Sequence, residues 1–225
     1  MKTKEIKMKK SAFSAAIFDL DGTVIDSMQD MLICMKAAYE KQGIYDAKPA
    51  KKHIGPALPE CLRNITPKAN PKLLESVADN YRGVYDKSTY PNTSLYPDIK
   101  ELFLGLKAKK IPAYLVTNKR LAPTLRILKQ KGLKMFKAVI SPDIQQGRSL
   151  SKAEMLALLL KKEGLNPESA VYIGDSVPDI KSARVNGIRT IAVTYGYTAK
   201  AALKKAAPAF LVKDVKGLAK IILRG

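Results

Sequence analysis

The chain has 225 residues, of which 46% are hydrophobic and 27% are charged. This composition is that of a globular protein with one large domain, or one domain carrying an insertion, and it excludes a wholly disordered or collagen-like chain. The 40 Lys and Arg residues against 20 Asp and Glu give a formal net charge of +20 at pH 7. Such a surplus attracts anions in general, from nucleic acid to small phosphates, without selecting among them.

The N-terminal residues and the cysteines indicate in which cellular compartment the protein is expected. The first ten residues contain five lysines and one glutamate, and the apolar run that a signal peptide or membrane helix requires does not follow them. We expect residues 1–12 to form a basic, flexible tail and expect no association with a membrane. Cys34 and Cys61 are too few for a disulfide framework and lack metal-ligand spacing, so we expect reduced thiols in a cytoplasmic protein.

Six short apolar runs are predicted to be β-strands. They are apolar almost without a break, which is typical of parallel strands whose sheet is covered by helices on both faces. These runs are Ala15–Leu20, Ala113–Thr117, Ala138–Ile140, Ala170–Gly174, Thr190–Thr194 and Ala209–Val212. The segments with helical spacing between and beside them are Pro97–Lys110, Leu121–Lys131, Ser151–Glu163, Pro178–Asn186 and Thr198–Ala206. The alternation predicts an α/β fold with a doubly wound, Rossmann-like parallel sheet.

One interval is too long for this pattern. More than ninety residues separate the first two predicted strands, whereas a crossover needs a single helix. The segments with helical spacing inside it are Ser27–Gln42, Pro49–His53, Pro59–Asn64 and Pro71–Asp86. We therefore expect residues 26–95 to form a helical subdomain, inserted into a core made of residues 13–25 and 96–225.

Two aspartate pairs follow predicted strands. Asp19 and Asp21 end the first strand, and Asp175 and Asp179 follow Ala170–Gly174. Ligands of open α/β sheets bind outside the carboxyl ends of the strands, and aspartates two residues apart on an extended segment point the same way. Concentrated carboxylates favour a divalent cation with oxygen ligands. Helix capping would explain one aspartate of the second pair but not both.

Polar and basic residues follow two further predicted elements. Thr117 and Asn118 end the strand that begins at Ala113, where a hydroxyl and backbone N–H groups suit phosphate oxygens, although an ordinary helix N-cap also explains them. Lys152 lies in the capping-box sequence Ser151-Lys152-Ala153-Glu154, where its cation opposes the helix dipole. An exposed lysine tolerates that position, and a lysine opposite an acidic, phosphate-bearing cleft would be well paired there.

In this order, the motifs resemble those of the haloacid dehalogenase superfamily of phosphatases. The matching segments are DLDGT at Asp19–Thr23, VTN at Val116–Asn118, Lys152, and GDSVPD at Gly174–Asp179. The inserted helices resemble the cap of the subgroup that includes phosphoglycolate phosphatases and β-phosphoglucomutases. Within it, residues 53–58 resemble the substrate-specificity loop, so His53 and Gly55 are candidate substrate-binding residues, as is Arg82 on a cap helix.

The resemblance implies a Mg²⁺-dependent phosphatase acting on a small phosphorylated metabolite, with 2-phosphoglycolate as the leading substrate. Asp19 would attack phosphorus to form an aspartyl-phosphate, and Asp21 would protonate the leaving oxygen and then activate water. The magnesium ligands would be Asp19, the main-chain carbonyl of Asp21, and Asp175, with Asp179 supporting the metal shell or Lys152. The residues that would hold the phosphoryl oxygens are Thr117, Asn118 and Lys152.

The motifs bear on several alternative functions. Asp21 argues against a dehalogenase, because a halide needs no proton, and DLDGT argues against a phosphonatase, although Lys51 and Lys52 lie in the right region for one. Signalling receiver domains are smaller and lack the insertion. A β-phosphoglucomutase-like phosphomutase stays open, as does a basic nucleic-acid-binding protein without catalysis, which the intact acidic set makes the weaker choice. A monomer or a homodimer is expected. Four of the twenty acidic residues belong to the proposed site, so we interpret the +20 surplus as a surface property that steers anionic substrates.

Overall fold

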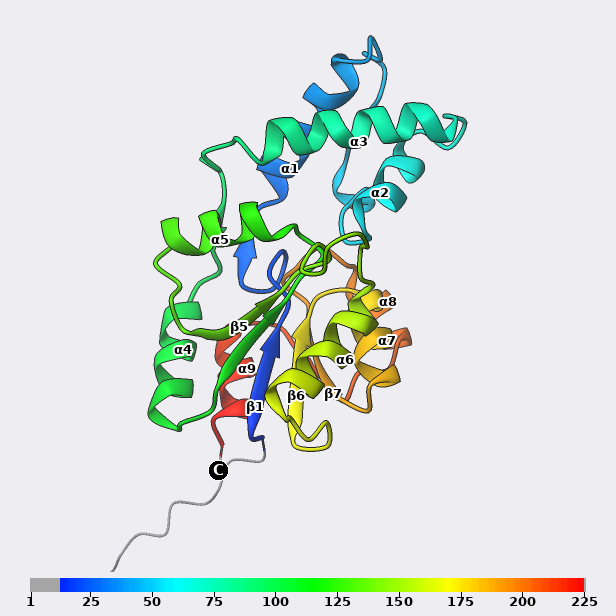
Figure 1. Cartoon of the computed structure of the whole chain (residues 1–225). Coiled ribbons are helices and arrows are strands. Elements are labelled where there is room, and N and C mark those ends of the chain that lie inside the picture. The colour runs from blue at the N-terminus through cyan, green and yellow to red at the C-terminus, as the bar shows by residue number, and fades with distance from the viewer. Residues whose placement is uncertain (1–12, 225) are drawn as a thin grey trace, which may run out of the picture.

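The computed structural model describes residues 13–224, so the basic tail expected over residues 1–12 lies outside the described residues (Figure 1). Six parallel strands form one sheet in the order β5-β4-β1-β6-β7-β8. Their bounds are Ala15–Phe18 (β1), Ala113–Val116 (β4), Phe136–Ile140 (β5), Ala170–Gly174 (β6), Arg189–Val193 (β7) and Phe210–Val212 (β8). The predicted α/β fold with a doubly wound parallel sheet is confirmed, and each predicted strand overlaps an observed one.

Helices cover both faces of this sheet (Figure 1). Their bounds are Ile99–Ala108 (α4), Leu121–Gln130 (α5), Lys152–Glu163 (α6), Val177–Val185 (α7), Lys200–Lys205 (α8) and Val215–Ile222 (α9). The sequence analysis predicted no element at α9. This helix is only eight residues long and contains Gly217, a poor helix former, but the Asp214 side chain accepts a hydrogen bond from the Gly217 N–H at 2.7 Å and so caps its N-terminus.

The central strand β1 shows why the predicted strands are apolar throughout. Phe18 faces one side of the sheet, where its ring lies 5.2 Å from that of Phe103 on α4. Its neighbour Ile17 faces the other side and packs in a cluster with Met155 of α6. All four side chains of β1 are buried. Burying an apolar side chain the size of Ile17 or Phe18 stabilises the fold by about 1.5–3 kcal/mol.

The strand order places the ends of β1 and β6 side by side. From β1 the chain continues to β4 and β5 on one side of the sheet, then crosses to β6, β7 and β8 on the other. Phe18 is paired with Ile173, and the Asp19 N–H donates to the Ile173 carbonyl at 2.8 Å. The order therefore reverses between β1 and β6, and such a reversal is where open α/β sheets bind ligands.

A helical segment lies beyond the carboxyl ends of the strands (Figure 1). It contains α1 (Met28–Glu40), the 3₁₀ helix η1 (Lys51–His53), α2 (Leu58–Ile65) and α3 (Pro71–Tyr85). The chain enters it at β2 (Ile25–Asp26) and leaves it at β3 (Ser94–Leu95), which pair antiparallel. Because the two crossings are hydrogen-bonded together, the segment is tethered to the sheet at one place.

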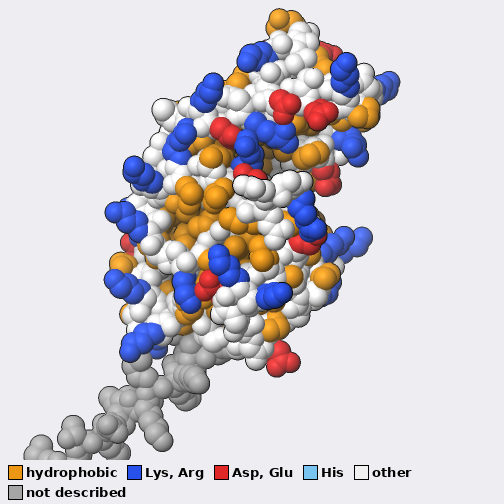
Figure 2. All heavy atoms as spheres, viewed as in Figure 1, with side chains coloured by type: hydrophobic (Ala, Val, Ile, Leu, Met, Phe, Trp, Pro, Cys, Tyr) orange, Lys and Arg blue, Asp and Glu red, His pale blue; other side chains and the backbone are white. Residues whose placement is uncertain are grey.

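The basic surplus is spread widely over the surface. Figure 2 shows Lys and Arg side chains distributed over the sheet domain and the helical segment alike, with fewer acidic side chains between them. In the part of the chain that the structure describes, no helix is long and apolar enough to cross a membrane.

Candidate active site

Three buried aspartates come together where β1 and β6 end. Asp19 follows β1, Asp175 follows β6, and Asp179 lies in the first turn of α7; one carboxylate oxygen of each lies within 4.8 Å of the others. The N-cap Ser176 orients Asp179, because its N–H and hydroxyl donate to Asp179 Oδ2 at 3.1 and 2.6 Å. The Asp179 N–H donates back to Ser176 Oγ at 3.2 Å. This capping box turns the Asp179 side chain back toward the end of β6.

Two glycines allow the aspartates to pack this closely. Gly22 has φ +79°, a left-handed conformation that favours glycine, and a Cβ atom there would clash with the carboxylate of Asp175. A Cβ atom on Gly174 would lie 2.7 Å from Cγ of Asp179. The glycines of DLDGT and GDSVPD therefore make room for carboxylates.

Lys152 joins two of the aspartates. Its Nζ lies 2.7 Å from Asp19 Oδ1 and 3.1 Å from Asp179 Oδ1, and its side chain is only 5% exposed. It also donates to the Val116 carbonyl at 3.2 Å and to the Tyr172 hydroxyl at 3.1 Å. The Tyr172 hydroxyl in turn donates to Asp179 Oδ1 at 3.0 Å. Lys152 is thus a buried cation that lies between two strand ends, although it occupies the first turn of a helix.

The site holds more negative charge than this lysine offsets. Burial raises the pKa of Asp19 to about 7, with Lys152 opposing the rise and Asp179 adding to it. Burial, with Asp179 and Asp19, also holds the pKa of Asp175 well above its ordinary value. Burial alone would lower the pKa of Lys152, but Asp179 and Asp19 raise it above its ordinary value. Oxygen ligands with uncompensated charge suit a divalent cation, so the residues present fit one.

Asp21 has different surroundings. Its side chain is 18% exposed, and its Oδ1 lies 3.1 Å from Nζ of Lys119 and accepts a hydrogen bond from the hydroxyl of Ser27. Ser27 is the N-cap residue of α1, and Lys119 also donates to the Tyr85 hydroxyl of α3. The carboxylate of Asp21 therefore lies on the side of the site that faces the helical segment.

Thr117 and Asn118 follow β4, the other neighbour of β1. Thr117 is buried, and its hydroxyl oxygen accepts the N–H of Lys119 at 3.1 Å. No hydrogen bond donated by this hydroxyl is recorded among the described residues, so its hydrogen can bind a phosphoryl oxygen. Asn118 is partly buried beside it. The strand end that carries these residues also provides the Val116 carbonyl that Lys152 contacts.

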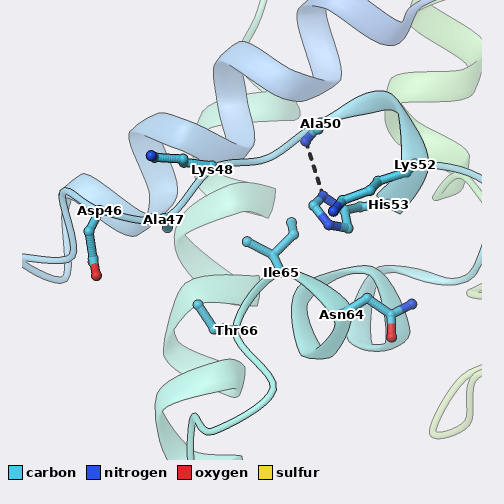
Figure 3. Close-up of a pocket in the computed structure, with 9 residues that line it drawn as sticks. All are labelled: Asp46, Ala47, Lys48, Ala50, Lys52, His53, Asn64, Ile65 and Thr66. Atoms are coloured by element: carbon cyan, nitrogen blue, oxygen red, sulfur yellow. Dashed lines mark hydrogen bonds between the residues drawn. The ribbon is translucent and has the colours of Figure 1, made fainter.

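The three candidates in the helical segment make local contacts. His53 is buried, accepts the Ala50 N–H on Nδ1 at 3.1 Å, and lines a cavity of about 410 Å³ within the segment (Figure 3). Burial, with Lys52 nearby, lowers the pKa of His53. Gly55, two residues after His53, has a positive φ of +125°. Arg82 pairs with Asp79 on its own helix at 2.7 Å. Within the described residues, the recorded polar contacts of His53 and Arg82 stay inside the helical segment.

Sequence reasoning missed four residues around the aspartates. The Tyr197 N–H donates to Asp175 Oδ2 at 2.7 Å, and Ser27, Lys119 and Tyr172 make the contacts given above. Lys119 directly follows Thr117-Asn118, and Tyr172 is the one polar side chain in the strand AVYIG. A buried hydroxyl usually has a hydrogen-bond partner, so the sequence could have indicated a polar contact for Tyr172. Nothing in the sequence indicates a site role for Ser27 or Tyr197, because only the fold brings them to the site.

Comparisons with known proteins agree with this architecture. The family model described as "Haloacid dehalogenase-like hydrolase" matches residues 16–193. A Vibrio cholerae protein named "Phosphoglycolate phosphatase" is 30% identical over 92% of this chain and 95% of its own length. A Caldanaerobacter subterraneus protein named "Putative pyrophosphatase PpaX" is 32% identical over 93% of this chain and 94% of its own.

A solved structure supports the same assignment. A haloacid dehalogenase-like hydrolase from Streptococcus pneumoniae superposes with a TM-score of 0.82 at 25% identity, covering 92% of this chain and 98% of that one. The resemblance predicted from the four motifs is therefore confirmed over most of the chain. The protein belongs to the haloacid dehalogenase-like hydrolase family.

Proposed function

We propose that the protein is a Mg²⁺-dependent phosphatase that hydrolyses a small phosphorylated metabolite through an aspartyl-phosphate, with 2-phosphoglycolate as the leading substrate. The observation that carries the proposal is the convergence of Asp19, Asp175 and Asp179 beside Lys152 at the ends of β1 and β6. The name of the Vibrio cholerae relative supports the choice of substrate.

In this proposal Asp19 and Asp21 have different roles. Lys152 holds Oδ1 of Asp19, which leaves Oδ2 to attack phosphorus. As the Oδ2–P bond forms, the bond from phosphorus to the leaving oxygen breaks, and Asp21 gives that oxygen a proton. Asp21 then takes a proton from the water that attacks the aspartyl-phosphate. This second step restores Asp19 and releases inorganic phosphate.

The remaining polar groups stabilise charge. Mg²⁺ would be held by Asp19, Asp175, Asp179 and the main-chain carbonyl of Asp21. When bound, it offsets the charge of the carboxylates and of the phosphoryl group, so that an anionic nucleophile can approach an anionic substrate. The residues that would bind the phosphoryl oxygens are Thr117, Asn118 and Lys152.

Residues 26–95 would act as a cap over this site. Cap and core touch where Tyr85 meets Lys119 and where Asp86 forms an ion pair with Arg120 at 2.6 Å. Both contacts lie at the C-terminal end of α3. A segment whose two chain connections are paired side by side, with few polar contacts to the core, can open for substrate and close to exclude water.

The test is phosphate release from a panel of phosphomonoesters, with Mg²⁺ and with a chelator. We expect release that requires Mg²⁺ and a loss of about 10³-fold or more in Asp19→Asn, since the nucleophile is removed. Asp46→Asn makes the same change at an exposed residue of the helical segment and serves as the matched control. Wild-type release in Asp19→Asn would refute the assignment, and isomerisation of a phosphosugar without release would indicate a mutase.

A further inference from the structure

A second buried lysine, Lys119, lies in the site, and the proposed mechanism does not use it. Its Nζ is 3.1 Å from Asp21 Oδ1, and its side chain is 6% exposed. Within the described residues, Asp21 is the only carboxylate within ion-pair distance of it. Keeping a cation out of water is costly unless it is paired, so Lys119 depends on Asp21 or on another anion beside it.

Aromatic rings from the helical segment form the other wall around this cation. The Tyr85 ring centroid lies 4.3 Å from Lys119 Nζ, and Nζ donates to the Tyr85 hydroxyl at 2.5 Å. Tyr81 stacks on Tyr85 with ring centroids 5.2 Å apart. Burial keeps the pKa of both tyrosines well above the ordinary value, so their hydroxyls are neutral and do not offset the charge of Lys119.

The position of Lys119 relative to Asp21 indicates which part of a substrate it faces. Asp21 is the proposed acid, so the leaving oxygen lies within hydrogen-bond distance of it, about 2.6–3.0 Å. A group one carbon beyond that oxygen is then close to Nζ, which contacts the same carboxylate. A lysine has three N–H donors, and Asp21 and Tyr85 account for two of those of Lys119. One donor is left for a ligand.

Charge balance identifies the ligand as an anion. The charge of the phosphoryl group would be offset by Lys152 and by the cation, whose ligands are grouped around Asp19. Asp21 is the single carboxylate paired with Lys119 among the described residues, and it also faces the leaving oxygen. A neutral leaving group would add no charge beside this buried cation, whereas a carboxylate or a second phosphate would pair with it.

We propose that Lys119 is a specificity-determining residue that binds an anionic group on the leaving part of the substrate. The protein would then select phosphate esters or anhydrides whose leaving group carries a carboxylate or phosphate, against those with a neutral alcohol. This inference rests on the proposed phosphatase function and narrows its substrate class.

The test compares two esters of similar size. 2-Phosphoglycolate has a carboxylate where 2-hydroxyethyl phosphate has a neutral hydroxymethyl group. We expect wild-type kcat/KM to favour 2-phosphoglycolate by about tenfold or more, and Lys119→Met to reduce that ratio to about one, because the cation is lost while the apolar stem is kept. Any effect that Lys119 has through Asp21 alters both esters alike and cancels in the ratio.

Two further variants serve as controls. Lys119→Arg keeps a cation and should retain the preference. Lys137→Met removes an exposed lysine of β5, 3.0 Å from Glu163, and should leave both kcat/KM values unchanged. If Lys119→Met does not fold, inhibition of the wild type decides the question: glycolate should compete with substrate at about tenfold lower concentration than ethylene glycol.

The outcomes separate this inference from the function on which it rests. A Lys119→Met protein that loses activity on both esters equally, with the ratio unchanged, would show that Lys119 only positions Asp21. A wild type that hydrolyses both esters equally well in Mg²⁺ would overturn the inference and leave the phosphatase function intact. Failure to hydrolyse any ester would overturn both.

Discussion

The acidic site and the helical segment above it are stabilised in different ways. At the site, Asp19, Asp175, Asp179 and Lys152 are buried charged side chains at the ends of paired strands and the starts of helices. In the helical segment, α1 and α3 pack through apolar residues, and the ion pairs Lys36–Glu40 and Arg82–Asp79 are partly or largely exposed and each lie within one helix. Rigid strand ends suit chemistry that needs fixed distances, whereas a segment held by apolar packing suits closure and selection.

The largest difference between the two regions should come from Lys152→Met. It removes the counter-charge of Asp19 and Asp179, so we expect kcat to fall by about 10³-fold and the free energy of unfolding to fall by about 3 kcal/mol. Phosphate release and urea denaturation measure the two effects. Removal of the exposed Lys36 in Lys36→Met should change the free energy of unfolding by no more than about 0.5 kcal/mol. Equal losses of unfolding free energy in the two variants would mean that the buried ion pairs of Lys152 contribute no more to stability than the exposed pair of Lys36.

Gly22→Ala should be next in size, and Gly132→Ala is its matched control. Both glycines have positive φ, +79° and +69°, so both alanines carry a backbone penalty of about 1–2 kcal/mol. Only at Gly22 would the added Cβ meet Asp175, while the space beside Gly132 is open. We expect Gly22→Ala to lose roughly a further 1–3 kcal/mol and to bind Mg²⁺ more weakly, measured by urea denaturation and by the Mg²⁺-induced rise in Tm. Indistinguishable variants would show that Asp175 moves aside easily.

The buried Asp19 should give the site its own pH dependence of stability. The pKa of Asp19 is about 7 in the folded protein against an ordinary value of 3.8, so between these values the folded state binds more protons than the unfolded state. This group's contribution to stability therefore falls as pH rises through that window. We expect the Tm of metal-free protein to fall by several degrees more from pH 5 to pH 8 in the wild type than in Asp19→Asn, and Mg²⁺ to raise the wild-type Tm more at pH 8 than at pH 5. Parallel curves for the two proteins would contradict this.

Arg82→Ala should have the smallest effect. Arg82 is partly exposed and pairs with Asp79 one turn away, so we expect changes of about 0.5 kcal/mol or less in stability and less than about threefold in kcat/KM. The resemblance instead suggested Arg82 as a substrate-binding residue. A rise of tenfold or more in KM for 2-phosphoglycolate would favour that hypothesis, and steady-state kinetics distinguish the two.

Local sequence was sufficient for most of the fold. Continuous apolar runs such as Ala170–Gly174 identified the strands because both faces of the sheet are buried, and the long interval after Ala15–Leu20 indicated an inserted helical segment. Helix α9 was missed because its stability comes from packing on α4 and from the Asp214 cap more than from helix propensity.

Local sequence also identified aspartates at strand ends, because DLDGT and GDSVPD are short motifs with characteristic spacing. The sequence could not show that Lys152 contacts both Asp19 and Asp179, or that Lys119 joins Asp21 to Tyr85. These contacts join residues 27 to 133 positions apart, and only the pairing order of the sheet and the placement of the helical segment bring them together. The roles of these residues stay predictions until the variants are measured.

The sequence by itself determined the α/β class, the family and the positions where acidic residues end strands, since each of these depends on neighbours within a few residues. The tertiary structure decided how many charges share one buried site and which residues face the leaving group. Electrostatic interactions depend on distance in space and on burial, which the chain sets only when it folds.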